Sequence, residues 1–152
     1  MALMTLAKAL KHRKRLAQRI AQVDQRANRN NSILVGNTRE VSVRDLLAER
    51  AKLVEQLVVV KLAIVTANVG IQERIFRISE LKGAITSLQQ MDTKNGKQEA
   101  PYQSQPPVYE AELTKADVER LVAELEARID RLQEEVDQYN YATEVEVPAV
   151  EV

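Results

Sequence analysis

Apolar residues recur every three or four positions along four stretches of the chain, which is the spacing of one face of an α-helix. The pattern predicts helices over about residues 2–27, 43–67, 71–91 and 114–140. Asn68 and Gly70, which are common at helix ends, separate the second helix from the third. One continuous helix over 43–91 is the alternative, because a single glycine is a weak helix breaker.

The fourth predicted helix has the most regular pattern. Its apolar residues alternate at spacings of four and three, as in the seam of a coiled coil. Thr114 followed by Asp117 is a capping pattern that marks its start. We expect this seam to form part of an interface between copies of the chain, and its candidate residues are Val118, Val122, Leu125, Ile129, Leu132 and Val136.

The second predicted helix is apolar on more than one side. One stripe includes Leu46, Leu53 and Leu57, and a second includes Leu47, Val54, Val58 and Val65. A helix that is apolar all round is normally buried. We therefore expect this helix at the centre of the fold.

A long loop and a short tail complete the pattern. Residues 92–113 contain Gly96 and three prolines, which predicts a loop. In the tail, residues 142–152, the sequence alternates with period two from Thr143 to Val147, with Glu at 144 and 146, until Pro148. This pattern predicts a short extended segment. Because an extended tail can add to the edge of another chain, Val145 and Val147 join the candidate oligomer interface.

These elements predict one all-α domain over residues 1–152. We expect an antiparallel four-helix bundle of coiled-coil character, with the long loop and the extended tail. The length is sufficient for one hydrophobic core. With one Phe, four Tyr and no Trp, that core must consist of Leu, Ile, Val and Ala.

Charge is sorted along a chain whose net charge is zero. Residues 1–31 contain eight bases and one acid, whereas residues 110–140 contain ten acids and four bases. The first and last helices are therefore expected to pair, within one chain or between copies. The bases also include a compact basic patch, made of Lys11, Arg13, Lys14, Arg15 and Arg19. Such patches can bind nucleic acid or anionic lipid. Helix pairing is favoured because compensating acids exist and no aromatic residue interleaves the patch.

Few residues suggest chemistry. The chain has no Cys, which excludes disulfides, thiolate metal sites and Cys nucleophiles. His12 is the sole histidine, and we expect it to be solvated, because no ligand or catalytic partner stands at helical spacing from it. The acids lack the Glu-x-x-His pairs of bundle metal sites, and no phosphate-binding glycine loop is present. We expect no metal, no cofactor and no enzymatic activity.

Hydropathy gives no candidate membrane span. The longest apolar run, Leu57–Val69, contains Lys61 and is shorter than the roughly 20 residues that a span requires. The first residues also lack the pattern of a secretory signal. We expect a cytoplasmic protein.

A polar cluster is expected at one end of the bundle. In an up-down bundle, the ends of the second and fourth helices lie together, near the start of the third. This arrangement would gather a candidate site for a small polar ligand or a protein partner, made of Asn68, Arg74, Asn140, Tyr141 and Thr143. The alternative is that the two asparagines only cap their helices.

Three segments resemble a known family. They are Leu6–Ile20 followed by Asn30-Asn31, Ile64–Asn68 followed by Glu73-Arg74, and Asn140–Val145. Together they resemble the septicolysin-like family of small helical bacterial proteins, although Ala67 replaces the family's Thr and Tyr141 its Trp. Residues 146–152 extend past the family's usual end. The resemblance implies an all-helical bundle and assigns no biochemical role.

The favoured interpretation is a non-enzymatic structural or scaffolding protein. It would self-associate into a homo-oligomer through helical seams and its tail. The second hypothesis is a binding module that uses the Asn68 and Asn140 end. The third is a nucleic-acid or anionic-membrane binder that uses the basic first helix.

Overall fold

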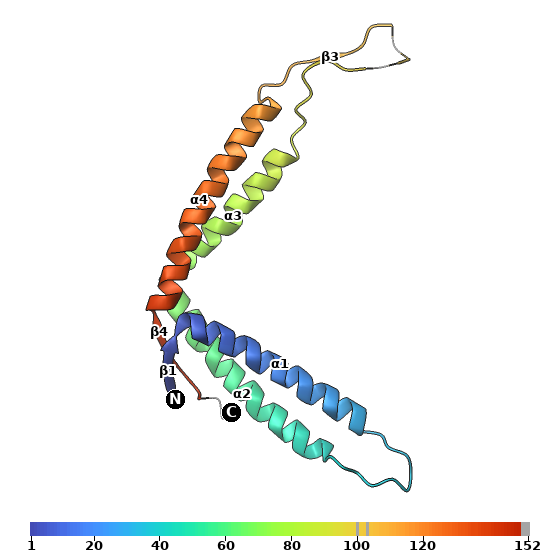
Figure 1. Ribbon diagram of the computed structural model, residues 1–152, viewed down its shortest axis with the longest axis vertical. Helices are drawn as coiled ribbons and strands as arrows, with labels where there is room; N and C mark the ends of the chain where they lie inside the picture. The colour runs from blue at the N-terminus through green and yellow to red at the C-terminus, as the bar shows by residue number, and fades with distance from the viewer. Residues whose placement is uncertain (100, 103, 150–152) are drawn as a thin grey trace. The chain divides into compact units, whose positions relative to one another are not determined.

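The computed structural model describes residues 1–99, 101–102 and 104–149, and it is mostly helical (Figure 1). In chain order, the elements are β1 (Ala2–Thr5), α1 (Leu6–Asn30), α2 (Val43–Asn68), α3 (Gln72–Gln89), β2 (Gly96–Lys97), β3 (Val108–Tyr109), α4 (Lys115–Ala142) and β4 (Glu144–Val147). The predicted helical class is confirmed, and two small antiparallel sheets are added to it. Residues 100 and 103 of the predicted loop and 150–152 of the predicted tail lie outside the described residues.

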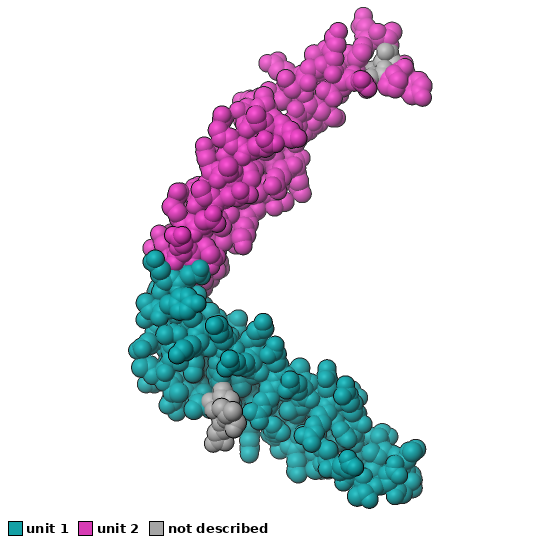
Figure 2. Space-filling model, viewed as in Figure 1, with its two compact units in different colours: residues 1–70, 137–152 teal, residues 71–136 magenta. Residues whose placement is uncertain are grey.

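The chain divides into two compact units (Figure 2). Unit 1 comprises Met1–Gly70 and Asp137–Val152, and unit 2 comprises Ile71–Val136. Helix α4 runs through both sets of residues.

Unit 1 is built on a helical hairpin in which α1 and α2 lie side by side (Figure 1). Its core is aliphatic, as the composition predicts, and consists of Leu6, Ala9, Leu16, Val23, Ala27, Leu46, Leu53, Val60, Ile64, Val145 and Val147. Two exposed ion pairs connect the helices, Arg19 with Glu49 at 3.3 Å and Arg50 with Asp24 at 2.6 Å. Pairs of this kind contribute about 0–1 kcal/mol each, so the apolar core is the main source of stability.

The start of α1 differs from the prediction. Residues Ala2–Thr5 form strand β1 instead of the first helical turn, and Thr5 Oγ1 accepts a hydrogen bond from the backbone N–H of Lys8 at 3.3 Å. Strand β1 pairs antiparallel with β4, with Ala2 opposite Val147. The predicted helical start at residue 2 is wrong because the strand's partner lies at the other end of the sequence, where local periodicity cannot reveal it.

Helix α2 begins and ends at the signals that the sequence contains. Ser42 Oγ accepts from the backbone N–H of Asp45 at 3.2 Å, which caps the first turn. The helix ends at Asn68, and α3 starts at Gln72, so residues 43–91 form two helices. At the junction the Tyr139 hydroxyl donates to the Ala67 carbonyl at 2.6 Å. A Cβ on Gly70 would lie 2.8 Å from the Tyr139 Oη, which explains why a glycine stands there.

In unit 2, α3 and α4 lie side by side (Figure 1). The buried side chains of the unit include Ile71, Ile78 and Leu81 together with Val118, Val122 and Val136. The guanidinium of Arg74 donates to the Glu135 carboxylate and connects the two helices. Between the helices, Gly96–Lys97 pairs with Val108–Tyr109 in a two-residue ladder within the predicted loop.

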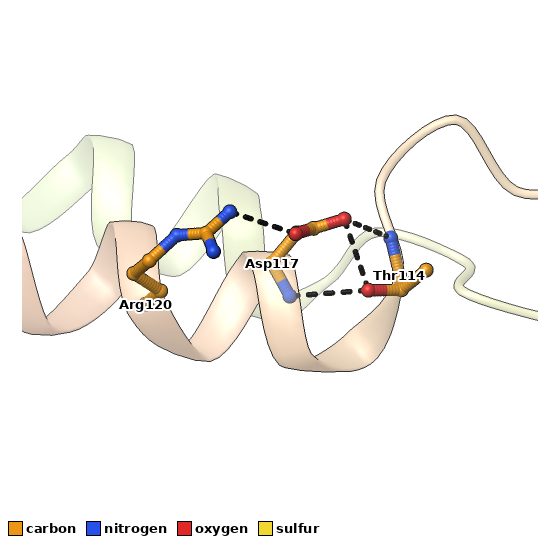
Figure 3. A network of polar contacts seen from close by, with 3 residues as sticks. All are labelled: Thr114, Asp117 and Arg120. Atoms are coloured by element: carbon orange, nitrogen blue, oxygen red, sulfur yellow. Dashed lines mark hydrogen bonds and ion pairs between the residues drawn. The ribbon is translucent and has the colours of Figure 1, made fainter.

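The first turn of α4 is capped as the sequence predicts (Figure 3). Thr114 and Asp117 cap each other, because the Asp117 carboxylate accepts from the Thr114 backbone N–H at 3.0 Å while Thr114 Oγ1 accepts from the Asp117 N–H at 3.2 Å. Arg120 also donates to Asp117 at 2.8 Å. The Thr114 N–H, followed by the Thr114 hydroxyl and Arg120, lowers the pKa of the Asp117 carboxyl.

Candidate assembly surfaces

Helix α2 has an apolar surface that the described part of the chain leaves exposed. We call it the outer stripe, and its residues are 52–74% exposed: Leu47, Val58, Leu62, Val65 and Val69. From Val58 onward they follow each other at spacings of four, three and four, so they lie on one side of the helix. Leu46, Leu53 and Val60, by contrast, are at most 6% exposed in the core with α1. The prediction that α2 is buried on all sides is therefore wrong for the single chain.

The outer stripe is large for an isolated apolar surface. At these exposed fractions the five side chains leave on the order of 500 Å² of apolar surface in water, comparable to the largest patches on monomeric proteins, which are often functional. A standard protein interface buries about 800 Å² on each partner. With its surroundings, the stripe has the size of an interaction surface.

The predicted seam of α4 lies within the chain's own unit 2. Val118, Val122 and Val136 are buried, and Leu125, Ile129 and Leu132 are half-buried. Leu88 of α3 and Val118 of α4 line the same cavity, which shows that the two helices face each other there. The single chain thus already buries half of the predicted seam residues and half-buries the others.

The predicted tail interface is also used internally. Val145 is 8% exposed and Val147 is fully buried, and both belong to the core of unit 1. The edge of β4 pairs with β1 of the same chain. An interface through these two valines would require β4 to leave its position, so the structure assigns them to the core instead.

The basic patch lies on the surface of α1. Lys11, Arg13, Lys14 and Arg15 are exposed, and Arg19 is exposed but paired with Glu49. In the described part of the chain, the first four form no ion pair. Helix α1 packs on α2, so the predicted pairing of the first helix with the last does not supply the core of unit 1.

The predicted polar cluster is only partly assembled. A cavity of about 470 Å³ lies at this end of unit 1, and Thr66, Tyr139 and Thr143 line it. The Thr143 carbonyl accepts from the Leu6 N–H at 2.7 Å, so its backbone is also used to hold the start of α1.

The other predicted members of that cluster do not line this cavity. Asn68 and Asn140 are half-buried, while Tyr141 is 69% exposed. Arg74 pairs with Glu135 inside unit 2. The cluster predicted from helix ends therefore contributes one residue, Thr143, to the cavity lining.

His12 is buried, and the prediction of a solvated histidine is wrong. It is 6% exposed in α1, and its Nε2 has no hydrogen-bond partner among the described residues. The sequence contains a signal for this position. His12 follows Ala9 by three residues and precedes Leu16 by four, which places it on the buried stripe.

Metal sites and membrane spans are two further classes of site. Within residues 1–99, 101–102 and 104–149, no three His, Asp or Glu side chains are grouped so that they could hold a metal ion. In the same residues no single helix is long and apolar enough to cross a membrane, although α2 and α3 taken as a broken pair meet that criterion of length and composition.

Comparison with known proteins gives no assignment. No family model matches the chain, and no curated protein or solved structure matches it either. The resemblance to the septicolysin-like family therefore stays a prediction from three short motifs.

Proposed function

We propose that this chain is a structural protein that self-associates into a homo-oligomer through the outer stripe of α2. The observation that carries the proposal is the exposure of Val58, Leu62 and Val65, at 53%, 67% and 64%, on the side of α2 that α1 does not cover. Removing such surface from water is favourable at roughly 25 cal/mol per Å². A partner with a long apolar helix face is required.

A second copy is the partner that supplies such a face. The outer stripe extends from Leu47 to Val69, about 33 Å along the helix at 1.5 Å per residue. Two copies related by a twofold axis would cover each other's stripes in one isologous contact. Two α1–α2 hairpins would then pack as four helices, so the four-helix bundle predicted from the sequence would arise between chains.

The test is the oligomeric state of the purified protein at micromolar concentration, measured by light scattering and by native mass spectrometry. In high-salt buffer, which screens contacts between exposed charges, we expect the wild type to be a dimer or larger and the variant Leu62→Gln/Val65→Gln to be a folded monomer with an unchanged helical circular dichroism spectrum. Both positions are exposed, so the substitutions leave the core intact. Phe76→Gln is the matched control, because Phe76 is 63% exposed on α3, and it should leave the mass unchanged. A wild-type monomer would refute the proposal.

The cavity beside Tyr139 supports a second hypothesis, a binding module for a small polar ligand. The residues that line it include Thr66, Tyr139 and Thr143, whose side chains carry hydroxyl groups that can form hydrogen bonds. A thermal-shift screen of polar metabolites against the wild type and Thr143→Val discriminates this hypothesis. A compound that stabilises the wild type and not the variant would support it, and the absence of any stabilising compound would remove its support.

Three further predictions remain part of the proposal. They are a cytoplasmic location, the lack of enzymatic activity, and nucleic-acid or anionic-membrane binding as the third hypothesis for the basic helix. The third hypothesis is supported by the exposed bases of α1. Adding RNA, DNA or anionic vesicles to the purified protein tests it.

A further inference from the structure

Helix α1 presents a row of cations along one side. We call it the basic stripe: Lys8, Lys11, Arg15, Arg26 and Arg29. All five are exposed, and none forms an ion pair in the part of the chain that the structure describes. The intervals between them are three, four, eleven and three residues, which keeps the side chains on one face of the helix. The stripe extends about 32 Å along the helix axis.

Helix α4 presents a matching row of anions. We call it the acidic stripe: Glu119, Glu126, Asp130 and Glu134. All four are exposed, and among the described residues none is ion-paired, in contrast to Glu135, which Arg74 neutralises. The intervals of seven, four and four residues again correspond to one face. This stripe covers about 23 Å, so the basic stripe, at about 32 Å, is long enough to span it.

The two compact units carry opposite net charges of equal size. Unit 1 contains 13 basic and nine acidic residues, for a net charge of +4, and unit 2 contains nine basic and 13 acidic residues, for a net charge of −4. Within its own unit, α1 packs on α2 and α4 lies along α3, and both charged stripes are left in solvent. Each chain therefore carries two surfaces of complementary charge, the basic stripe and the acidic stripe.

We propose that the basic stripe of one copy binds the acidic stripe of a second copy. The inference rests on the proposed self-association and adds a second, distinct contact to it. A contact of α1 with α1, or of α4 with α4, would place like charges together and is disfavoured. The contact therefore joins two different surfaces. Such a contact either closes reciprocally about a twofold axis or repeats to form rings or filaments. The apolar outer stripe joins chains in pairs, and the charged stripes connect the pairs.

A second copy fits the basic stripe better than a nucleic acid does. The complement is present in the same chain in equal net amount, and the stripe has no interleaved aromatic residue for base stacking. Each exposed charge pair contributes little by itself, so the affinity of this contact depends on the sum of the charge pairs along both stripes. The association they mediate should therefore weaken as salt screens it.

Paired charge reversals test the contact. The base-reversed variant is Lys11→Glu/Arg15→Glu, and the acid-reversed variant is Glu126→Lys/Asp130→Lys. Both keep the i, i+4 like-charge spacing already present, so helix stability should change little. Arg13→Glu is the control for α1, because Arg13 is exposed but lies two residues, or about 200° around the helix, from both Lys11 and Arg15.

The measurement is sedimentation velocity of nuclease-treated protein at low and high salt. We expect wild type to form species larger than the pair at low salt and to return to the pair at high salt. Each reversed variant should lose the larger species, with an association constant lower by about tenfold or more. An equimolar mixture of the two variants should regain them, as should one chain that carries both reversals. Arg13→Glu should behave as wild type.

Specific outcomes would overturn the inference. One is a wild-type pair with no salt-sensitive larger species, and another is a mixture of the two variants that fails to reassociate. Large species that need added RNA, DNA or anionic vesicles would assign the basic stripe to those partners instead. Leu62→Gln/Val65→Gln separates this result from the proposed function, because that variant removes the apolar contact and not the charged one. A wild-type monomer at every salt concentration would refute both.

Discussion

The contact between Gly70 and Tyr139 provides the sharpest test of the structure of unit 1. Tyr139 Oη donates to the Ala67 carbonyl at 2.6 Å, and this carbonyl belongs to the last turn of α2, where the helix offers it no partner. A methyl group on residue 70 would lie 2.8 Å from the same oxygen. Gly70→Ala should therefore push the tyrosine away and weaken the bond.

The magnitude follows from those distances. Gly70→Ala should lower the free energy of unfolding by about 1–3 kcal/mol, the range for overpacking at a tight contact. Tyr139→Phe alone removes one hydrogen bond and should cost about 0.5–1.5 kcal/mol. In the phenylalanine background the clashing oxygen is gone, and the nearest remaining ring atom, Cζ, lies 3.4 Å from the new methyl. In this background Gly70→Ala should lower the free energy of unfolding by less than about 0.5 kcal/mol. Residue 70 has no positive φ, and alanine reduces the conformational entropy of the unfolded chain.

The assay is a double-mutant cycle by urea unfolding, followed by circular dichroism at one fixed protein concentration. We expect the double variant to be more stable than the sum of the single effects, by about 1 kcal/mol or more. Gly83→Ala is the matched control, since nothing lies within 4 Å of a Cβ placed in that position of α3. It should raise stability by about 0.5–1 kcal/mol through helix propensity alone. Additivity of the two substitutions within about 0.5 kcal/mol would refute the contact.

Two further predictions concern polar groups. His12→Leu should raise the free energy of unfolding by about 1–3 kcal/mol in urea titrations, because it removes a buried Nε2 that has no hydrogen-bond partner. Destabilisation would instead show that this nitrogen forms a hydrogen bond in solution. Asp117→Asn should destabilise the protein at neutral pH. Because the pKa of Asp117 is lowered in the folded state, mainly by the Thr114 N–H, its contribution is present above the ordinary Asp value of about 3.9 and is lost as the pH falls through the folded pKa. Wild type and variant should therefore converge in stability once the pH has fallen below the folded-state pKa, and a constant difference would contradict the assigned cause.

Local signals in the sequence predict the helices well. The capping residues Ser42, Thr114 and Asp117 act as expected, and the break after Asn68 separates α2 from α3. These features depend on residues within one or two turns, so periodicity is sufficient to find them. Strand β1 could not be found in this way, because it exists only through its pairing with β4.

The candidate sites were less predictable because they depend on how the helices pack. The bases of the patch were expected at the surface and are exposed, since charged side chains stay hydrated. The helix ends predict that Asn68 and Asn140 lie together at a bundle end, but the cavity at this end of unit 1 is lined by Thr143 and by neither asparagine. Residue type alone predicts that His12 is solvated, and this is wrong, because its spacing from Ala9 and Leu16 places it on the buried face.

Helix α2 links the sequence to the proposed assembly. Its apolar residues are distributed around the helix, which predicts burial on all sides, yet the chain buries one side and leaves Leu62 67% exposed on the other. The two observations agree if a second copy completes the burial. An apolar stripe is complementary to itself, so that contact can close with twofold symmetry. A stripe of like charges cannot, so the bases of α1 and the acids of α4 require a different partner surface. High salt should therefore separate the two kinds of contact, leaving apolar pairs while the charged connections between them dissociate.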